Sequence, residues 1–247
     1  MRIAILTILL LPQWIAAEEA TVAAASNFRA ALDTIVAVFE STTPHSITIV
    51  GGSTGQLYAQ IVSGAPYDIL LAADQERPSL LEESGHAVTG QRFTYATGRL
   101  ALLASRYELR QDDLQQTALQ PAIRKFAIAN PSLAPYGVAA QEALMAIGAW
   151  DTVSGKLVFG ENVSQAFILV ATGNAQAGMV ALSSVLAVDG GFRSAYLPVP
   201  AEFHAPIRQD AVLLVHGADN AAAIEFLTFL QSDTARNMMV SLGYGVN

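Results

Sequence analysis

Short apolar runs alternate with longer segments of helical periodicity along nearly the whole chain. Nine strands are expected, at residues 21–25, 46–50, 67–72, 99–104, 125–129, 156–159, 177–182, 195–198 and 211–216. Six helices are expected between them, at residues 28–42, 55–63, 77–83, 138–147, 164–172 and 220–232. In the first helix, Phe28, Leu32, Ile35 and Phe39 recur at the spacing of a single buried face. Alternating helices and largely apolar strands predict an α/β fold of mainly parallel sheets flanked by helices.

Two extended segments without helical pattern divide the chain. They span residues 95–99 and 198–207, and the second contains three prolines. If these segments lie side by side, residues 18–96 plus 203–247 form one lobe and residues 97–202 form the other. The sequence therefore predicts two α/β lobes joined by two crossings, with a cleft between them. Clefts between domains are preferred ligand sites.

Residues 1–17 have the pattern of a secretory signal peptide. Arg2 supplies a positive charge, an apolar stretch follows, and the segment ends in Ala16 and Ala17. The apolar stretch is shorter than the ~20 residues needed to cross a bilayer, which argues against a membrane anchor. We expect export with cleavage after Ala17. Because the chain has no Cys to carry a lipid, a free periplasmic protein is expected.

Composition excludes several classes of site. The net charge is −8, and nucleic-acid-binding proteins normally show a basic footprint. The absence of Cys excludes disulfides, Cys-ligated zinc, iron–sulfur centres and thiol catalysis. The four His show no pairing at helical spacing, so no metal site is expected. The Gly-rich segment GGSTGQ lacks the Lys of a nucleotide-binding loop.

Polar residues gather in four turns that each join an expected strand to an expected helix, at residues 26–27, 51–55, 130–137 and 160–163. In open α/β sheets ligands bind at the carboxyl ends of strands, and helix N-termini favour anions. Two turns come from each lobe, so they could surround a small oxyanion with hydroxyl and main-chain N–H donors. None contains Lys or Arg, which favours a fully ionised oxyanion over phosphate. Taken singly, each turn is better explained by plain helix capping.

Five segments occur in order along the chain: AAASNF, GGSTGQLYAQIVSGAPYDILLAAD, NPSLAPYGVAAQEAL, GENVSQAF and GMVALSSV. With them, the chain from about residue 20 to its C-terminus resembles the periplasmic molybdate-binding components of ABC importers. The resemblance implies a two-lobed periplasmic-binding-protein fold that closes over molybdate or tungstate using neutral donors. It also implies delivery of the oxyanion to an ABC permease in the inner membrane, without enzymatic activity or a cofactor. We expect the protein to be a monomer.

The oxyanion ligands of that family carry over to Ser26, Asn27, Ser53, Thr54, Tyr136 and Val163. Thr54 aligns slightly better than Ser53 with the hydroxyl ligand of the second turn. Tyr136 and Val163 fall where the third and fourth turns give main-chain N–H groups. All of these contacts go to oxygen, so molybdenum itself has no protein ligand.

One position departs from the family pattern. Some members bring a Tyr ligand from the strand that matches GMVALSSV, but Ala181 stands at that position here. The hydroxyl of Tyr136 could replace it from the opposite side of the site. If it does not, the oxyanion has one donor fewer.

Two other functions remain open. The segment GGSTG matches the nucleophile elbow G-x-S-x-G, which would make Ser53 a hydrolase nucleophile with His204 or His216 as base. Against this, only one expected strand of the mature chain comes before the strand that leads into the elbow, and no HGGG-like segment precedes it. The other possibility is a binding protein of the same fold for sulfate, phosphate or an organic anion.

Overall fold

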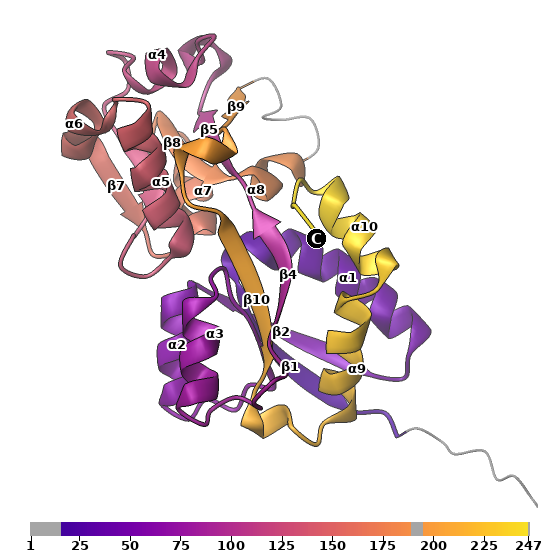
Figure 1. Cartoon of the computed structure of the whole chain (residues 1–247). Helices are drawn as coiled ribbons and strands as arrows, with labels where there is room; N and C mark the ends of the chain where they lie inside the picture. The colour runs from indigo at the N-terminus through magenta and orange to yellow at the C-terminus, as the bar shows by residue number, and fades with distance from the viewer. Residues whose placement is uncertain (1–15, 189–194, 247) are drawn as a thin grey trace, which may run out of the picture.

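The computed structural model describes residues 16–188 and 195–246 (Figure 1). Residues 1–15 of the predicted signal peptide lie outside the described residues. Across the two described ranges, no helix combines the length and apolar character needed to cross a membrane.

The first sheet has the strand order β2-β1-β3-β10-β4. Its strands are β1 (Glu19–Ala25), β2 (Ser46–Gly52), β3 (Ile69–Leu71), β4 (Phe93–Gly98) and β10 (Ile207–Leu213). One face packs against α1 (Arg29–Thr42), α9 (Ala221–Leu230) and α10 (Asp233–Ser241). The other face packs against α2 (Thr54–Val62) and α3 (Glu76–Glu83). We call this sheet with its helices lobe one.

The second sheet has the strand order β7-β6-β8-β5-β9. Its strands are β5 (Leu100–Ala104), β6 (Phe126–Ala129), β7 (Leu157–Gly160), β8 (Ala177–Ala181) and β9 (Tyr196–Pro198). One face packs against α4 (Leu114–Ala118), α5 (Pro135–Ala146) and α6 (Trp150–Val153). The other face packs against α7 (Val163–Ala171) and α8 (Leu182–Leu186). We call this sheet with its helices lobe two.

Five 3₁₀ turns complete the described secondary structure, at Ser26–Phe28, Tyr107–Leu109, Ser154–Lys156, Ala201–Phe203 and Val215–Gly217. In each sheet a single strand is reversed. β10 runs antiparallel to β3 and β4, and β5 runs antiparallel to β8 and β9, while the other described pairings are parallel. The predicted α/β class with mainly parallel strands is therefore confirmed, and both sheets are mixed.

The reversed strands belong to the two crossings between the lobes (Figure 1). β4 ends at Gly98 in lobe one and β5 begins at Leu100 in lobe two. The chain returns after β9, and Ile207 at the start of β10 pairs with Gly98. The crossings thus enter lobe one side by side. The lobe boundaries at residues 96/97 and 202/203 stay a prediction.

The strand expected at residues 211–216 is displaced, because β10 begins at Ile207 and ends at Leu213. Its first half contains Gln209 and Asp210, which are 0% and 1% exposed. These two polar residues interrupt the apolar pattern, so the pattern did not predict a strand there. The apolar pattern also did not predict β4, which was expected only as an extended crossing. Buried polar side chains are compatible with a strand only when tertiary hydrogen bonds satisfy them. Asp210 has such partners, since it accepts hydrogen bonds from Thr94 (2.6 Å) and Arg92 (2.6 Å).

Helices α4, α6, α8 and α10 were not expected from the sequence. The first three are only four or five residues long, and α10 buries just Ala235 and Met239. Four expected helices begin earlier than predicted, α2 at Thr54, α3 at Glu76, α5 at Pro135 and α7 at Val163. Pro suits the first position of a helix, where its missing N–H is not needed. The earlier starts place Thr54, Tyr136 and Val163 inside first helical turns.

The lobe-one core supplies a test of the packing. Phe226 on α9 is fully buried, and its ring meets that of Phe39 on α1 edge to face at 5.3 Å. Phe226→Ala is expected to lower the free energy of unfolding by about 3–5 kcal/mol, through lost burial and a residual cavity. Urea denaturation followed by circular dichroism measures this. Phe159→Ala is the control, since Phe159 is 55% exposed; an equal loss in both variants would contradict the packing described.

Candidate functional site

The four polar turns meet at one small cavity between the lobes. From lobe one it is lined by Ala25, Ser26, Asn27, Gly52, Ser53, Thr54 and Ala73; from lobe two, by Ala134, Pro135, Tyr136, Asn162 and Val163. The structure thus brings together all six residues predicted to bind an oxyanion. None of the described lining residues is charged. Any anion held here would be surrounded by dipoles alone.

The first turn follows β1 and contains Ser26 and Asn27. Asn27 is 3% exposed, and its side-chain Nδ2 donates to Oε1 of Gln209 at 2.9 Å. Its carbonyl oxygen accepts from the Tyr244 hydroxyl at 2.6 Å. The amide side chain of Asn27 is therefore engaged in the interior. Its main-chain N–H is the donor left for a ligand.

The second turn separates the roles of Ser53 and Thr54. Ser53 caps α2: its Oγ accepts from the main-chain N of Gln56 at 3.3 Å and donates to Oε1 of Gln56 at 2.9 Å. Thr54 Oγ1 accepts from the main-chain N of Ala73 at 3.0 Å. A hydroxyl has one proton to donate, and that of Ser53 is already directed at Gln56. Within the described contacts, the proton of Thr54 is still available.

The third turn begins α5 and contains Tyr136. As a first-turn residue, Tyr136 has a main-chain N–H without an intrahelical acceptor. Its hydroxyl accepts a hydrogen bond from Nε2 of Gln209 at 3.3 Å, and a Cβ on Gly98 would lie 2.2 Å from it. Burial raises the pKa of the Tyr136 hydroxyl well above its usual value of 10, so the group stays neutral.

The hydroxyl of Tyr136 thus lies against the crossing strands. Ala181, where some family members have a Tyr ligand, is buried at the end of β8. It is not among the residues that line the cavity. The replacement of that missing hydroxyl by Tyr136 stays a prediction.

The fourth turn begins α7 at Val163. Asn162 caps the helix by accepting from the main-chain N of Gln165 at 3.0 Å. The next residue, Ser164, reaches lobe one: its Oγ donates to the carbonyl of Ser26 at 3.0 Å, and its N–H donates to Ser26 Oγ at 3.4 Å. The first and fourth turns are therefore in direct contact across the lobes.

Another contact joins the second turn, in lobe one, to the third turn, in lobe two. The main-chain N of Gly55 donates to the carbonyl of Leu133 at 2.9 Å. A Cβ on Gly55 would lie 2.9 Å from that carbonyl oxygen, closer than real side chains approach. Gly55 thus permits the two backbones to meet. Gln56 adds a hydrogen bond from Nε2 to Oε2 of Glu161 at 3.3 Å. The described structure has its lobes closed around the cavity.

Several side chains behind the site were missed by the sequence analysis, namely Gln56, Tyr95, Ser183, Gln209 and Tyr244. The spacing of Ser53 and Gln56 is that of a capping box and was available as a signal. Gln209 gave no such signal, because its partners are far away in the sequence. The hydrogen bond from Asn27 to Gln209 spans 182 positions.

The structure does not assemble the hydrolase triad. Ser53 Oγ contacts Gln56, whereas Nδ1 of His204 contacts the carbonyl of Ala205 at 2.8 Å and Nδ1 of His216 contacts Asp68 at 2.8 Å. A catalytic serine needs a base within hydrogen-bond reach. Among the described contacts, no histidine reaches Ser53.

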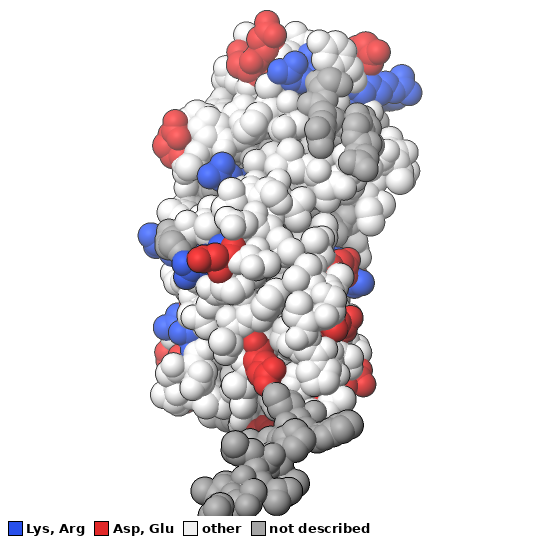
Figure 2. Space-filling model, turned by 90° about the vertical axis from the view of Figure 1, so that its right-hand side faces the viewer, with Lys and Arg blue, Asp and Glu red and all other residues white. Residues whose placement is uncertain are grey.

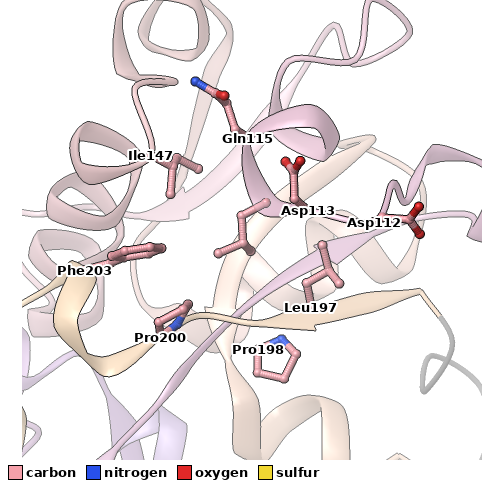
Figure 3. Close-up of a pocket in the computed structure, with 9 residues that line it drawn as sticks. Asp112, Asp113, Gln115, Ile147, Leu197, Pro198, Pro200 and Phe203 are labelled. Atoms are coloured by element: carbon pink, nitrogen blue, oxygen red, sulfur yellow. The ribbon is translucent and has the colours of Figure 1, made fainter.

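A larger groove of about 450 Å³ lies on lobe two, away from the four turns (Figure 3). Its apolar lining includes Ile147, Leu197 and Phe203, and its charged residues are Asp112 and Asp113. Two carboxylates beside an apolar surface disfavour an anion. Charged side chains are sparse over the middle of the molecular face shown in Figure 2. The small cavity between the lobes is the better candidate for an oxyanion.

Comparison with known proteins agrees with this architecture. Residues 20–245 match the family model described as bacterial extracellular solute-binding protein. The chain is 42% identical over 229 residues to the molybdate-binding protein ModA of Rhodobacter capsulatus, covering 93% of this chain and 89% of the relative. It is 40% identical to ModA of Azotobacter vinelandii, covering 93% and 91%.

A solved structure gives the same result. The periplasmic molybdate-binding protein of Azotobacter vinelandii superimposes with a TM-score of 0.86 at 33% identity, covering 92% of this chain and 99% of that chain. The predicted resemblance and the two-lobed fold are thereby confirmed, and the family is one of binding proteins rather than enzymes. The chain therefore belongs to the family of bacterial extracellular solute-binding proteins.

Proposed function

We propose that this protein binds molybdate or tungstate in the periplasm and delivers it to an ABC permease in the inner membrane. The observation that carries the proposal is the convergence of Ser26, Asn27, Ser53, Thr54, Tyr136 and Val163 on one uncharged cavity between the lobes. The names and similarity of the curated relatives support molybdate as the cargo. The proposal also includes cleavage of the signal peptide after Ala17 and a monomeric mature protein.

Binding depends on the hydrogen-bond donors that line the cavity. The oxyanion enters between the open lobes, which then close about the two crossings. Closure removes water from the oxyanion and replaces it with oriented dipoles, chiefly the N-termini of α2, α5 and α7. In a site of low dielectric these fixed donors interact more strongly with the oxyanion than they would in water.

Selectivity rests on donor count and on cavity size. The described lining contains no carboxylate to accept a proton, so a fully ionised oxyanion is favoured over protonated phosphate. Sulfate is smaller than molybdate and would leave longer hydrogen bonds in the same closed cavity. Molybdate and tungstate are nearly equal in size, so similar affinities are expected for these two.

Titration calorimetry with molybdate, tungstate, sulfate and phosphate tests the proposal. We expect tight binding of molybdate and tungstate and much weaker binding of the other two anions. Comparable affinities for sulfate and molybdate would favour a less specific anion-binding protein. No binding of any of the four would contradict an oxyanion site.

The free hydroxyl of Thr54 gives a second prediction. Thr54→Val removes a donor to the oxyanion and is expected to weaken binding by about 1.5–3 kcal/mol, the value of a hydrogen bond to a charged group. Ser53→Ala removes a helix cap, so it is expected to cost about 1 kcal/mol of stability with a smaller effect on binding. Calorimetry and thermal denaturation of both variants separate the two roles. The reverse ranking of affinities would make Ser53 the ligand.

Closure gives a third prediction, centred on Gly55. Gly55→Ala places a Cβ against Leu133 and is expected to weaken binding and to enlarge the radius of gyration of the ligand-bound protein. Alanine is favoured over glycine within a helix, so the variant should remain folded. X-ray scattering with and without molybdate measures closure. Gly51→Ala is the matched control, because a Cβ there meets nothing within 4 Å; equal behaviour of the two variants would contradict the contact.

A further inference from the structure

Gln209 is a buried polar residue that connects the two lobes. It lies in β10, where the pairing with β4 shifts register between Gln209 and Asp210. Gln209 has no exposed surface. A buried amide is costly unless both its oxygen and its nitrogen have partners. The partners of Gln209 come from three other segments of the chain.

Two of these partners belong to lobe one. Oε1 of Gln209 accepts hydrogen bonds from Nδ2 of Asn27 at 2.9 Å and from the hydroxyl of Tyr95 at 3.0 Å. The third partner belongs to lobe two, since Nε2 of Gln209 donates to the hydroxyl of Tyr136 at 3.3 Å. The contacts to Asn27 and Tyr95 lie within one lobe. Only the contact to Tyr136 crosses between lobes.

Asn27 and Tyr136 are also lining residues of the oxyanion cavity, one from each lobe. The side chain of Asn27 donates to Gln209 and the hydroxyl of Tyr136 accepts from it, and each residue keeps a main-chain N–H for the ligand. We propose that Gln209 is a positioning residue for oxyanion binding. When the lobes close, its amide joins the first turn of lobe one, which contains Asn27, to helix α5 of lobe two, which contains Tyr136. The inference rests on the proposed function and adds to it a residue outside the cavity lining.

Gln209 lies close to the crossings about which the lobes would rotate. Gln209 stands two positions after Ile207, where the returning chain pairs with Gly98 at the end of β4. Tyr136 is packed against the same crossing, close to Gly98. A rotation of the lobes about the crossings therefore changes the distance between Gln209 and Tyr136. This hydrogen bond is present in the described structure, whose lobes are closed, and its loss on opening is part of the proposal.

A contact present only in the closed form slows ligand release. Opening must break the bond between Gln209 and Tyr136 before the oxyanion leaves, whereas capture by the open form does not require it. Other hydrogen bonds also join the lobes, among them that of Ser183, whose Oγ donates to the carbonyl of Asn27 at 3.1 Å. Loss of the Gln209 contact should thus accelerate release without abolishing closure.

The test uses the mature protein, residues 18–247, with the variants Gln209→Leu, Tyr136→Phe and the double variant. Calorimetry gives the affinity for molybdate, and exchange of isotope-labelled molybdate gives the dissociation rate. Each single variant is expected to weaken affinity roughly tenfold, mainly through faster dissociation. The double variant should bind no more weakly than the weaker single variant, because both remove the same contact.

Thermal denaturation of the ligand-free protein separates positioning from a purely structural role. If Gln209 only stabilises lobe one, Gln209→Leu lowers the melting temperature and leaves the dissociation rate unchanged. Thr94→Val is the matched control: it removes a hydrogen bond to Asp210 on the same pair of strands, within lobe one. This control should lower stability and leave dissociation unchanged. If Gln209→Leu does not fold, the variant Gln209→Met, which keeps the length of the side chain, is used in its place.

Failure of the inference differs from failure of the proposed function. If the unmodified protein binds molybdate but Gln209→Leu has an unchanged dissociation rate, the positioning role is overturned. Fully additive effects in the double variant overturn it as well. If the unmodified protein binds neither molybdate nor tungstate, the proposed function itself fails.

Discussion

An anion that is held without a neighbouring positive charge must receive its stabilisation from dipoles that are already oriented. The cavity between the lobes meets this constraint with helix N-termini and hydroxyl groups, and its described lining carries no charge. Individual dipoles are weak, so several must converge and water must be excluded. That requirement explains why the site draws on both lobes. It also makes contact between the lobes a condition of binding.

The contact between the lobes depends on a close approach of backbones and on polar groups buried at the crossings. Gly55 and Leu133 meet through main-chain atoms, which leaves no room for a side chain. Behind the cavity, Asn27, Gln209 and Tyr136 form a chain of hydrogen bonds from one lobe to the other. Such groups are costly when unsatisfied and directional when satisfied. These hydrogen bonds restrict the relative orientation of the two lobes more than apolar packing does.

The acidity of the chain is separate from this site. The net charge is −8, yet the described residues that line the cavity are neutral. Acidic side chains occupy other places, such as the groove that contains Asp112 and Asp113 (Figure 3). Capture of an anion is therefore not assisted by long-range attraction to the protein. Selectivity and affinity arise after entry, when the lobes close.

Much of the fold and of the candidate site could be predicted from local patterns. The alternation of apolar strands and amphipathic helices predicted the α/β class, and the polar strand-to-helix turns with the family resemblance predicted six of the twelve described residues that line the cavity. Local patterns suffice there because strand ends and helix starts are set by neighbouring residues. They failed at β10, where Gln209 and Asp210 replace apolar residues in a buried strand.

The sequence by itself determined which residues stand at the four turns, the absence of Lys and Arg from them and the approximate path of the chain. The capping of α2 by Ser53 and Gln56 is a local pattern, but only the tertiary structure decided that Thr54 accepts from the main-chain N of Ala73. It also decided that Asn27 and Tyr136 turn their side chains toward Gln209. The physical reason is distance along the chain: these hydrogen bonds join residues up to 182 positions apart, and no local pattern specifies their partners.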